Sequence, residues 1–175
     1  MTRKPFQVSQ AGELARAFNK AGVEYLFLGK GGAIILGYPG TTQDVDVFAK
    51  RSPENGRRIV AALRELGFDI DRALEKELVT GKDFVQIKNG PFDTDIVFSP
   101  DGIASFEAAK QRSITTGIFH VANLRDIIAS KKASARKKDI NELPLMESFR
   151  KEYEKRHAPP LKSALDVARK RNRKH

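Results

Sequence analysis

Apolar residues along the chain gather in short runs that are separated by turns rich in glycine and polar residues. A short, wholly apolar run bounded by turn residues is typical of a buried strand. These runs predict strands at Tyr25–Leu28, Val45–Phe48, Phe68–Ile70, Phe84–Ile87, Thr94–Phe98 and Ser113–Thr116. Asn89–Gly90 lies between two of them and predicts a tight turn that joins antiparallel strands.

Other segments place apolar residues three or four positions apart, as one face of a helix does. They predict helices at 9–21, 33–36, 53–66, from about 123 onward, at 141–153 and at 161–168. The clearest start is Ser52–Pro53, where a capping residue precedes a proline at the first helical position. Ser9 is expected to cap the first helix. Elements in this order predict an α+β fold, in which a mixed sheet is flanked by helices.

The length and composition suit a small globular protein. Of its 175 residues, we expect 1–118 to form an α/β core and 119–175 a helical C-terminal region with a basic tail. The chain has no cysteine, which excludes disulfides, zinc–thiolate sites and thiol catalysis. No run approaches the roughly 20 apolar residues of a membrane span, and no apolar segment follows the basic start. We therefore expect a cytoplasmic protein without a membrane partner.

Positive charge is concentrated toward the C-terminus. The formal net charge is +10, and basic runs occupy residues 131–138 and 151–175. Such charge favours a nucleic acid or a nucleotide as partner, because a polyanion releases its counterions on binding. The alternative is a solvated helix face followed by a frayed terminus, and the last seven residues fit this alternative at least as well.

Two aspartates flank Val45 in one of the predicted strands. Residues two apart on a strand point to the same face, so the carboxylates of Asp44 and Asp46 are expected to project together. Adjacent carboxylates repel each other unless a cation lies between them, and Mg²⁺ is commonly held by one or two carboxylates with substrate phosphates. An Asp-x-Asp pair also arises often by chance on an exposed strand.

A glycine-rich segment, Gly29–Gly32, lies between a predicted buried strand and a helix. Glycines at such a place let backbone N–H groups approach a phosphate, and Lys30 adds a point charge. The spacing matches neither the P-loop nor the glycine pattern of dinucleotide-binding folds. Close packing alone explains one or two of these glycines but not the whole group.

A third acid, Asp95, lies with Asp93 on one face of a predicted strand whose other face is apolar. If this strand lies beside the one that carries Asp44 and Asp46, three carboxylates can hold two metal ions, one for a triphosphate and one for an attacking hydroxyl. The competing interpretation is that Asp93 serves the turn and Asp95 pairs with a nearby lysine or arginine.

Together these segments resemble a known family. Residues 28–33 and 37–46 are similar to the opening motif of the nucleotidyltransferases of the DNA polymerase beta superfamily, which has a strand, a Gly-Gly or Gly-Ser helix start, Asp-x-Asp and a third Asp on a later strand. Residues 124–131 and 136–139 resemble a stretch of the small bacterial branch that includes abortive-infection and toxin–antitoxin nucleotidyltransferases. The resemblance spans roughly residues 25–147 and implies a nucleotidyltransferase fold.

The resemblance also implies an activity and a site. The activity is transfer of an NMP from an NTP to a hydroxyl of a tRNA-like RNA or a protein, with two Mg²⁺ ions, or Mn²⁺ in their place, and a cognate antitoxin as a further partner. The implied catalytic metal ligands are Asp44, Asp46 and Asp95, the last also as general base. The implied nucleotide-binding residues are Gly29, Lys30, Gly31, Thr42, Lys131 and Arg136.

Two positions depart from the family pattern. Lys30 occupies the place of the second glycine or serine of the usual pair, and Gly40 the place of an arginine that often precedes the Asp-x-Asp stretch. Both changes bear on nucleotide binding, so two alternatives stay open: a catalytically silent nucleic-acid-binding module, and a regulatory partner such as one half of a toxin–antitoxin pair. His120 is expected to be structural.

Overall fold

The computed structural model describes residues 7–134 and 137–157, which form one mixed six-stranded sheet flanked by helices. The described helices are α1 (Val8–Ala21), α2 (Gly29–Ile35), α3 (Pro53–Glu65), α4 (Arg72–Thr80), α5 (Phe106–Arg112), α6 (Leu124–Ser134) and α7 (Lys137–His157). The strands are β1 (Tyr25–Leu28), β2 (Val45–Ala49), β3 (Phe84–Ile87), β4 (Thr94–Val97), β5 (Ile114–Thr116) and β6 (Phe119–Val121), in the sheet order β3-β4-β2-β1-β6-β5. The expected α+β architecture is confirmed.

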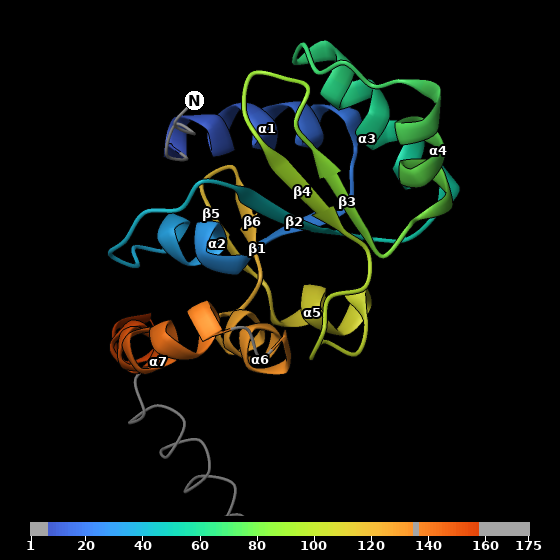
Figure 1. Ribbon diagram of the computed structural model, residues 1–175. Helices are drawn as coiled ribbons and strands as arrows, with labels where there is room; N and C mark the ends of the chain where they lie inside the picture. The colour runs from blue at the N-terminus through green and yellow to red at the C-terminus, as the bar shows by residue number, and fades with distance from the viewer. Residues whose placement is uncertain (1–6, 135–136, 158–175) are drawn as a thin grey trace, which may run out of the picture.

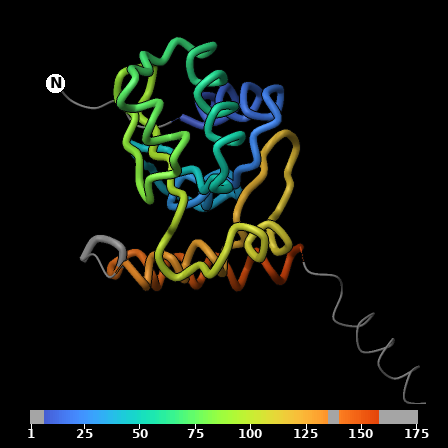
Figure 2. Tube along the Cα trace, turned by 90° about the vertical axis from the view of Figure 1, so that its right-hand side faces the viewer, coloured from blue at the N-terminus to red at the C-terminus, as the bar shows by residue number. Residues whose placement is uncertain are grey.

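The helices lie on two sides of the sheet (Figure 1). Helices α1, α3 and α4 are at one side, and α5, α6 and α7 are at the other. Figure 2 shows α7 as a long rod that crosses the molecule beside α6. Ion pairs join these two helices, from Arg125 to Glu154 at 2.7 Å and from Lys132 to Glu147 at 3.2 Å.

The two central strand pairs run in different directions. Strand β1 pairs with β2 antiparallel, whereas β2 pairs with β4 parallel. In this parallel pair Val45 lies opposite Thr94 and Asp46 lies opposite Asp95. The hydroxyl of the buried Thr94 donates a hydrogen bond to the Val45 carbonyl at 3.1 Å, which ties the pair together at its start. The hairpin expected around Asn89–Gly90 is confirmed, because β3 and β4 are antiparallel neighbours.

One buried amide connects α3 to the sheet. Asn55 is only 2% exposed, and its side chain accepts a hydrogen bond from the Glu24 N–H at 2.8 Å. It donates to the carbonyls of Glu24 at 3.0 Å and Lys50 at 2.8 Å. Glu24 precedes β1 and Lys50 follows β2, so this amide joins the two strand ends and satisfies their backbone groups.

The prediction of a strand at 68–70 is wrong. In the structure this segment belongs to no strand of the described sheet. Phe68 and Ile70 are buried, and the ring of Phe68 packs edge-on against that of Phe92 with centroids 5.2 Å apart. Burial in a connecting segment therefore produced the apolar pattern that resembles a strand.

Three elements, α4, α5 and β6, were not predicted by range, and one cap was misplaced. Helix α4 begins after Asp71, whose side chain accepts a hydrogen bond from the Leu74 N–H at 2.8 Å. Helix α1 is capped by Gln7 and not by Ser9, because Gln7 and Gln10 form a reciprocal capping box. Strand β6 is only three residues long and pairs with both β1 and β5.

Several boundaries also differ. Helix α2 begins at Gly29, so the glycine-rich segment is its first turn and not a loop before it. Helix α7 is longer at both ends than the predicted 141–153. The helix expected at 161–168 lies outside the described residues, and the division of the chain after residue 118 stays a prediction. In the described part of the chain, no helix is long and apolar enough to cross a membrane.

Candidate active site

The sheet brings Asp46 and Asp95 together. Strand β2 carries Asp46 as its second residue and β4 carries Asp95 as its second residue, and the parallel register places them opposite each other. Their carboxyl groups are close enough for each to act on the pKa of the other. Asp95 is only 8% exposed, and the charge of Lys88 acts on its pKa in the opposite direction to burial. The strand neighbourhood expected from the sequence is therefore present.

The electrostatics of these acids are unfavourable to negative charge. Burial raises the pKa of Asp46, and so do the neighbouring carboxyls of Asp95 and Asp44. Burial and the charges of Asp44 and Asp93 likewise raise the pKa of Asp95. The Lys131 ammonium acts in the opposite direction on the pKa of Asp46. Like charges are thus held close to one another at the start of β2 and β4, where a cation would relieve their repulsion.

Gly29 is required next to this pair. It has φ of 65°, in the left-handed region that favours glycine, and a Cβ added there would overlap the carboxylate of Asp46. Gly32 has a different role, because a Cβ there would lie 3.1 Å from the Phe27 carbonyl oxygen. The glycines therefore serve two needs: Gly29 leaves room for the Asp46 carboxylate, and Gly32 lets α2 pack on β1. Gly31 is buried in the first turn of α2.

The other predicted nucleotide-binding residues are related to the acids in different ways. Lys131, on α6, is close enough for its charge to affect Asp46, and only 11% of its side chain is exposed. The Thr42 hydroxyl donates to the carbonyl of Asp44 at 3.4 Å, so it supports the backbone at that acid. Arg136 lies outside the described residues. Their binding roles stay predictions.

The two departures from the family pattern are neighbours in space. A Cβ added at Gly40 would lie 3.1 Å from Cε of Lys30 and 3.7 Å from its Nζ. The Lys30 side chain therefore fills the space that a larger residue at position 40 would need. Position 30 thus contributes a basic side chain to the space beside position 40.

Sequence reasoning missed Glu142, which contacts that same lysine. Glu142 lies on α7, and its Oε1 accepts a hydrogen bond from Nζ of Lys30 at 2.8 Å. Its Oε2 lies 3.8 Å from Nζ of Lys131. No local signal marks this residue, because the contact to Lys30 spans 112 positions along the chain. Glu142 thus joins two of the predicted nucleotide-binding lysines.

The acids suit a divalent cation only in part. No group of three or more acidic or histidine side chains in the described ranges is arranged to enclose an ion by itself. The donors are nevertheless hard carboxylate oxygens that repel one another, which is the set that Mg²⁺ or Mn²⁺ prefers. Because Mg²⁺ usually takes its remaining ligands from water and substrate phosphates, Asp44, Asp46 and Asp95 fit an ion that a nucleotide helps to bind.

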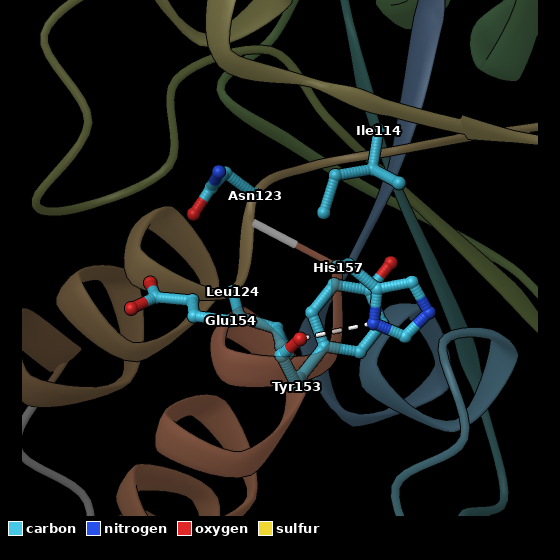
Figure 3. Close-up of a pocket in the computed structure, with 6 residues that line it drawn as sticks. All are labelled: Ile114, Asn123, Leu124, Tyr153, Glu154 and His157. Atoms are coloured by element: carbon cyan, nitrogen blue, oxygen red, sulfur yellow. Dashed lines mark hydrogen bonds between the residues drawn. The ribbon is translucent and has the colours of Figure 1, made fainter. Parts of the chain in front are cut away.

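A cavity of the described residues lies elsewhere. It has a volume of about 190 Å³ and is lined by Ile114, Asn123, Leu124, Tyr153, Glu154 and His157 (Figure 3). The rings of Tyr153 and His157 stack with centroids 4.0 Å apart, and His157 Nδ1 lies 2.9 Å from the Tyr153 carbonyl oxygen. The aspartates do not line this cavity, so its chemistry is separate from theirs. His120 contacts Thr115 and Tyr25, as a structural residue does.

Solved structures with a similar fold include two of ANT(2'')-Ia, an aminoglycoside nucleotidyltransferase. The solution structure of this antibiotic-resistance factor matches with a TM-score of 0.57 and 14% identity, over 97% of this chain and 98% of that one. The crystal structure of ANT(2'')-Ia in complex with adenylyl-2''-tobramycin matches with a TM-score of 0.53 and 15% identity, over 87% and 99%. The fold is nucleotidyltransferase-like.

This likeness covers nearly the whole described chain but comes with low identity, so it establishes the fold alone. No protein-family model matches the chain, and no curated protein matches it in sequence. The nucleotidyltransferase-like fold expected from the resemblance is therefore confirmed, while the assignment to the abortive-infection and toxin–antitoxin branch stays a prediction.

Proposed function

We propose that this protein is a metal-dependent nucleotidyltransferase that moves an NMP from an NTP to a hydroxyl acceptor. The observation that carries the proposal is the parallel register that places Asp46 opposite Asp95, with Asp44 close enough for its charge to act on both. The nucleotidyltransferase-like fold supports it. Gly29, which leaves room for the Asp46 carboxylate, also supports it.

In the proposed reaction, the acceptor hydroxyl oxygen bonds to the α-phosphorus while the bond from that phosphorus to the pyrophosphate oxygen breaks. Asp95 takes the hydroxyl proton, and pyrophosphate leaves with the electrons of the broken bond. Asp44 and Asp46, with Asp95, hold the divalent cations. When bound, these cations neutralise the phosphates and favour ionisation of the attacking hydroxyl. The Lys30 and Lys131 ammonium groups attract the triphosphate to the first turn of α2.

For the acceptor we favour a tRNA-like RNA or a protein, and the net charge of +10 is the supporting observation for an RNA. A second candidate is a small aminoglycoside-like alcohol, since ANT(2'')-Ia was crystallised with adenylyl-2''-tobramycin. A polycationic acceptor suits a basic protein less well than a polyanionic one. We also propose a role as one half of a toxin–antitoxin pair, which growth arrest on expression, relieved by a cognate antitoxin, would support.

The test is transfer of label from α-³²P-labelled NTPs in the presence of Mg²⁺, with total tRNA, lysate protein or tobramycin as acceptor. Asp46→Asn should lower the rate by at least about 100-fold, because it removes a metal-binding charge at the reacting phosphate. Asp69→Asn, at an exposed aspartate, is the matched control and should behave as wild type. Equal labelling by the wild-type and Asp46→Asn proteins would rule out the proposal.

The same samples separate an enzyme from a catalytically silent nucleic-acid-binding module. A silent module should bind RNA equally well as wild type and as Asp46→Asn, with an affinity that falls steeply as salt rises. Salt-dependent RNA binding without any transfer of label would favour that alternative.

A further inference from the structure

Glu142 reaches the proposed nucleotide site from the far end of the chain. Its carboxylate lies between two ammonium groups, with Oε1 2.8 Å from Nζ of Lys30 and Oε2 3.8 Å from Nζ of Lys131. All three side chains are largely buried, with 19% of Glu142, 20% of Lys30 and 11% of Lys131 exposed. Lysine ammonium groups bind both carboxylates and phosphate groups, so the Glu142 carboxylate and a phosphate would compete for these two lysines.

The carboxylate fits this place incompletely. Oε2 of Glu142 is buried, and no described residue donates a hydrogen bond to it. A buried acceptor without a donor lowers the stability of the contact that it makes. A phosphate group has more oxygens than a carboxylate and can accept bonds from both lysines at once. The pair of lysines is thus better matched to a phosphate than to the glutamate that lies there.

The helix that carries Glu142 has a break in its hydrogen bonding next to it. Pro144 lies inside α7, where proline has no N–H to donate to the carbonyl four residues earlier and disturbs the helix. The part of α7 after Pro144 is fixed to α6 through Glu147 and Glu154, and Met146 is fully buried. Before Pro144, Ile140 is 52% exposed. The turn with Glu142 therefore lacks one backbone hydrogen bond of the helix, although Leu143 beside it packs against the core.

We infer that the Lys30–Lys131 pair is a subsite for a phosphate of the NTP, and that Glu142 occupies it in the nucleotide-free protein and is displaced when the triphosphate binds. The inference rests on the proposed function, because it takes the NTP to bind at the first turn of α2. Helix α7 then competes with the nucleotide for the two lysines. Only the fraction of molecules in which Glu142 has left the subsite binds without that competition.

The experiment measures dissociation constants for ATP and for inorganic tripolyphosphate, each with Mg²⁺, by titration calorimetry. Glu142→Gln keeps the size of the side chain but removes its charge, and it should bind both probes about 3–10-fold more tightly than wild type. Glu142→Asp shortens the side chain and should give a smaller change in the same direction. Glu147→Gln is the matched control on the same helix, because Glu147 contacts Lys132 and Arg150 instead, and it should bind as wild type does.

Thermal melting of each variant checks that it is folded before binding is compared. Weaker or unchanged binding by both Glu142 variants, with Glu147→Gln equal to wild type, would overturn the inference and show that Glu142 positions the lysines or is indifferent to them. The proposed function would survive that result, since the wild-type protein would still bind ATP and transfer label. Absence of binding of either probe to every variant would overturn both.

Discussion

The two ends of the β1–β2 pair treat buried polar groups in opposite ways. At one end, the Asn55 amide makes three hydrogen bonds to the backbone of Glu24 and Lys50. At the other end, where Leu28 lies opposite Asp46, the Asp46 carboxyl faces a second carboxyl on β4. Both side chains lie at an end of the same strand pair, but only the Asn55 amide has hydrogen-bond partners for both its oxygen and its nitrogen.

This difference separates a structural group from a group that is arranged for a ligand. A neutral amide with its donors and acceptors paired stabilises the fold, because buried polar groups are favourable only when hydrogen-bonded. Adjacent acids with raised pKa lower the stability of the fold, as strained or repelling groups at binding sites often do. Substitutions at each end of the strand pair test this difference.

The largest effect is expected at the structural end. Asn55→Ala leaves the Glu24 N–H and the Lys50 carbonyl without their partner, and the free energy of unfolding should fall by about 3 kcal/mol. Denaturation by urea measures this change, with Asn141→Ala, at an exposed position, as the control. A loss below about 0.5 kcal/mol would show that water replaces the amide at the strand ends.

A smaller effect of opposite sign is expected at the other end. Asp46 has a raised pKa in the folded protein, so the wild type loses stability as the pH rises above the ordinary aspartate pKa of about 4. Asp46→Asn cannot ionise and escapes this loss. In a buffer with a metal chelator it should be more stable than wild type by on the order of 1 kcal/mol at pH 8, and by less at pH 5.

Urea titrations at the two pH values measure this difference, with Asp69→Asn as the matched control. An Asp46→Asn protein that is less stable than wild type at pH 8 would mean that the carboxylate is stabilised in the folded state, contrary to the charge repulsion described above.

The smallest effect is expected from the metal itself. Divalent cations that bind between the acids should stabilise the wild type by about 0.4 kcal/mol at a concentration equal to the dissociation constant, and Asp46→Asn by much less. Thermal melting with and without Mg²⁺ or Mn²⁺ measures the shift. An equal shift for both proteins would place the bound metal away from Asp46.

Local patterns in the sequence predicted the parts of the site that are local. Asp44, Asp46 and the glycines before them are close along the chain, and the turn at Asn89–Gly90 indicated that β4 pairs with β3. The register of Asp46 against Asp95 was beyond reach, because it depends on how two distant strands pair. Apolar periodicity also failed at Phe68–Ile70, where burial without strand pairing produced the same pattern.

The contact of Glu142 with Lys30 shows the limit most clearly. Nothing in the sequence around either residue indicates the other, and the contact exists because α7 packs beside α6, which itself packs against α2. An arginine missing at Gly40 was visible in the sequence, but the lysine side chain beside it was not. Such relations between distant segments require the packed structure.

The parallel pairing of β2 and β4 has a consequence for how the protein folds. The hydroxyl of Thr94 and the carbonyl of Val45 that join these strands are 49 positions apart, and a parallel pair cannot close through a short hairpin. Contacts across so long a loop form only after its closure entropy has been lost, which slows folding. The acids on these strands thus meet late on the folding route, and a chain that stops short of β4 never assembles them.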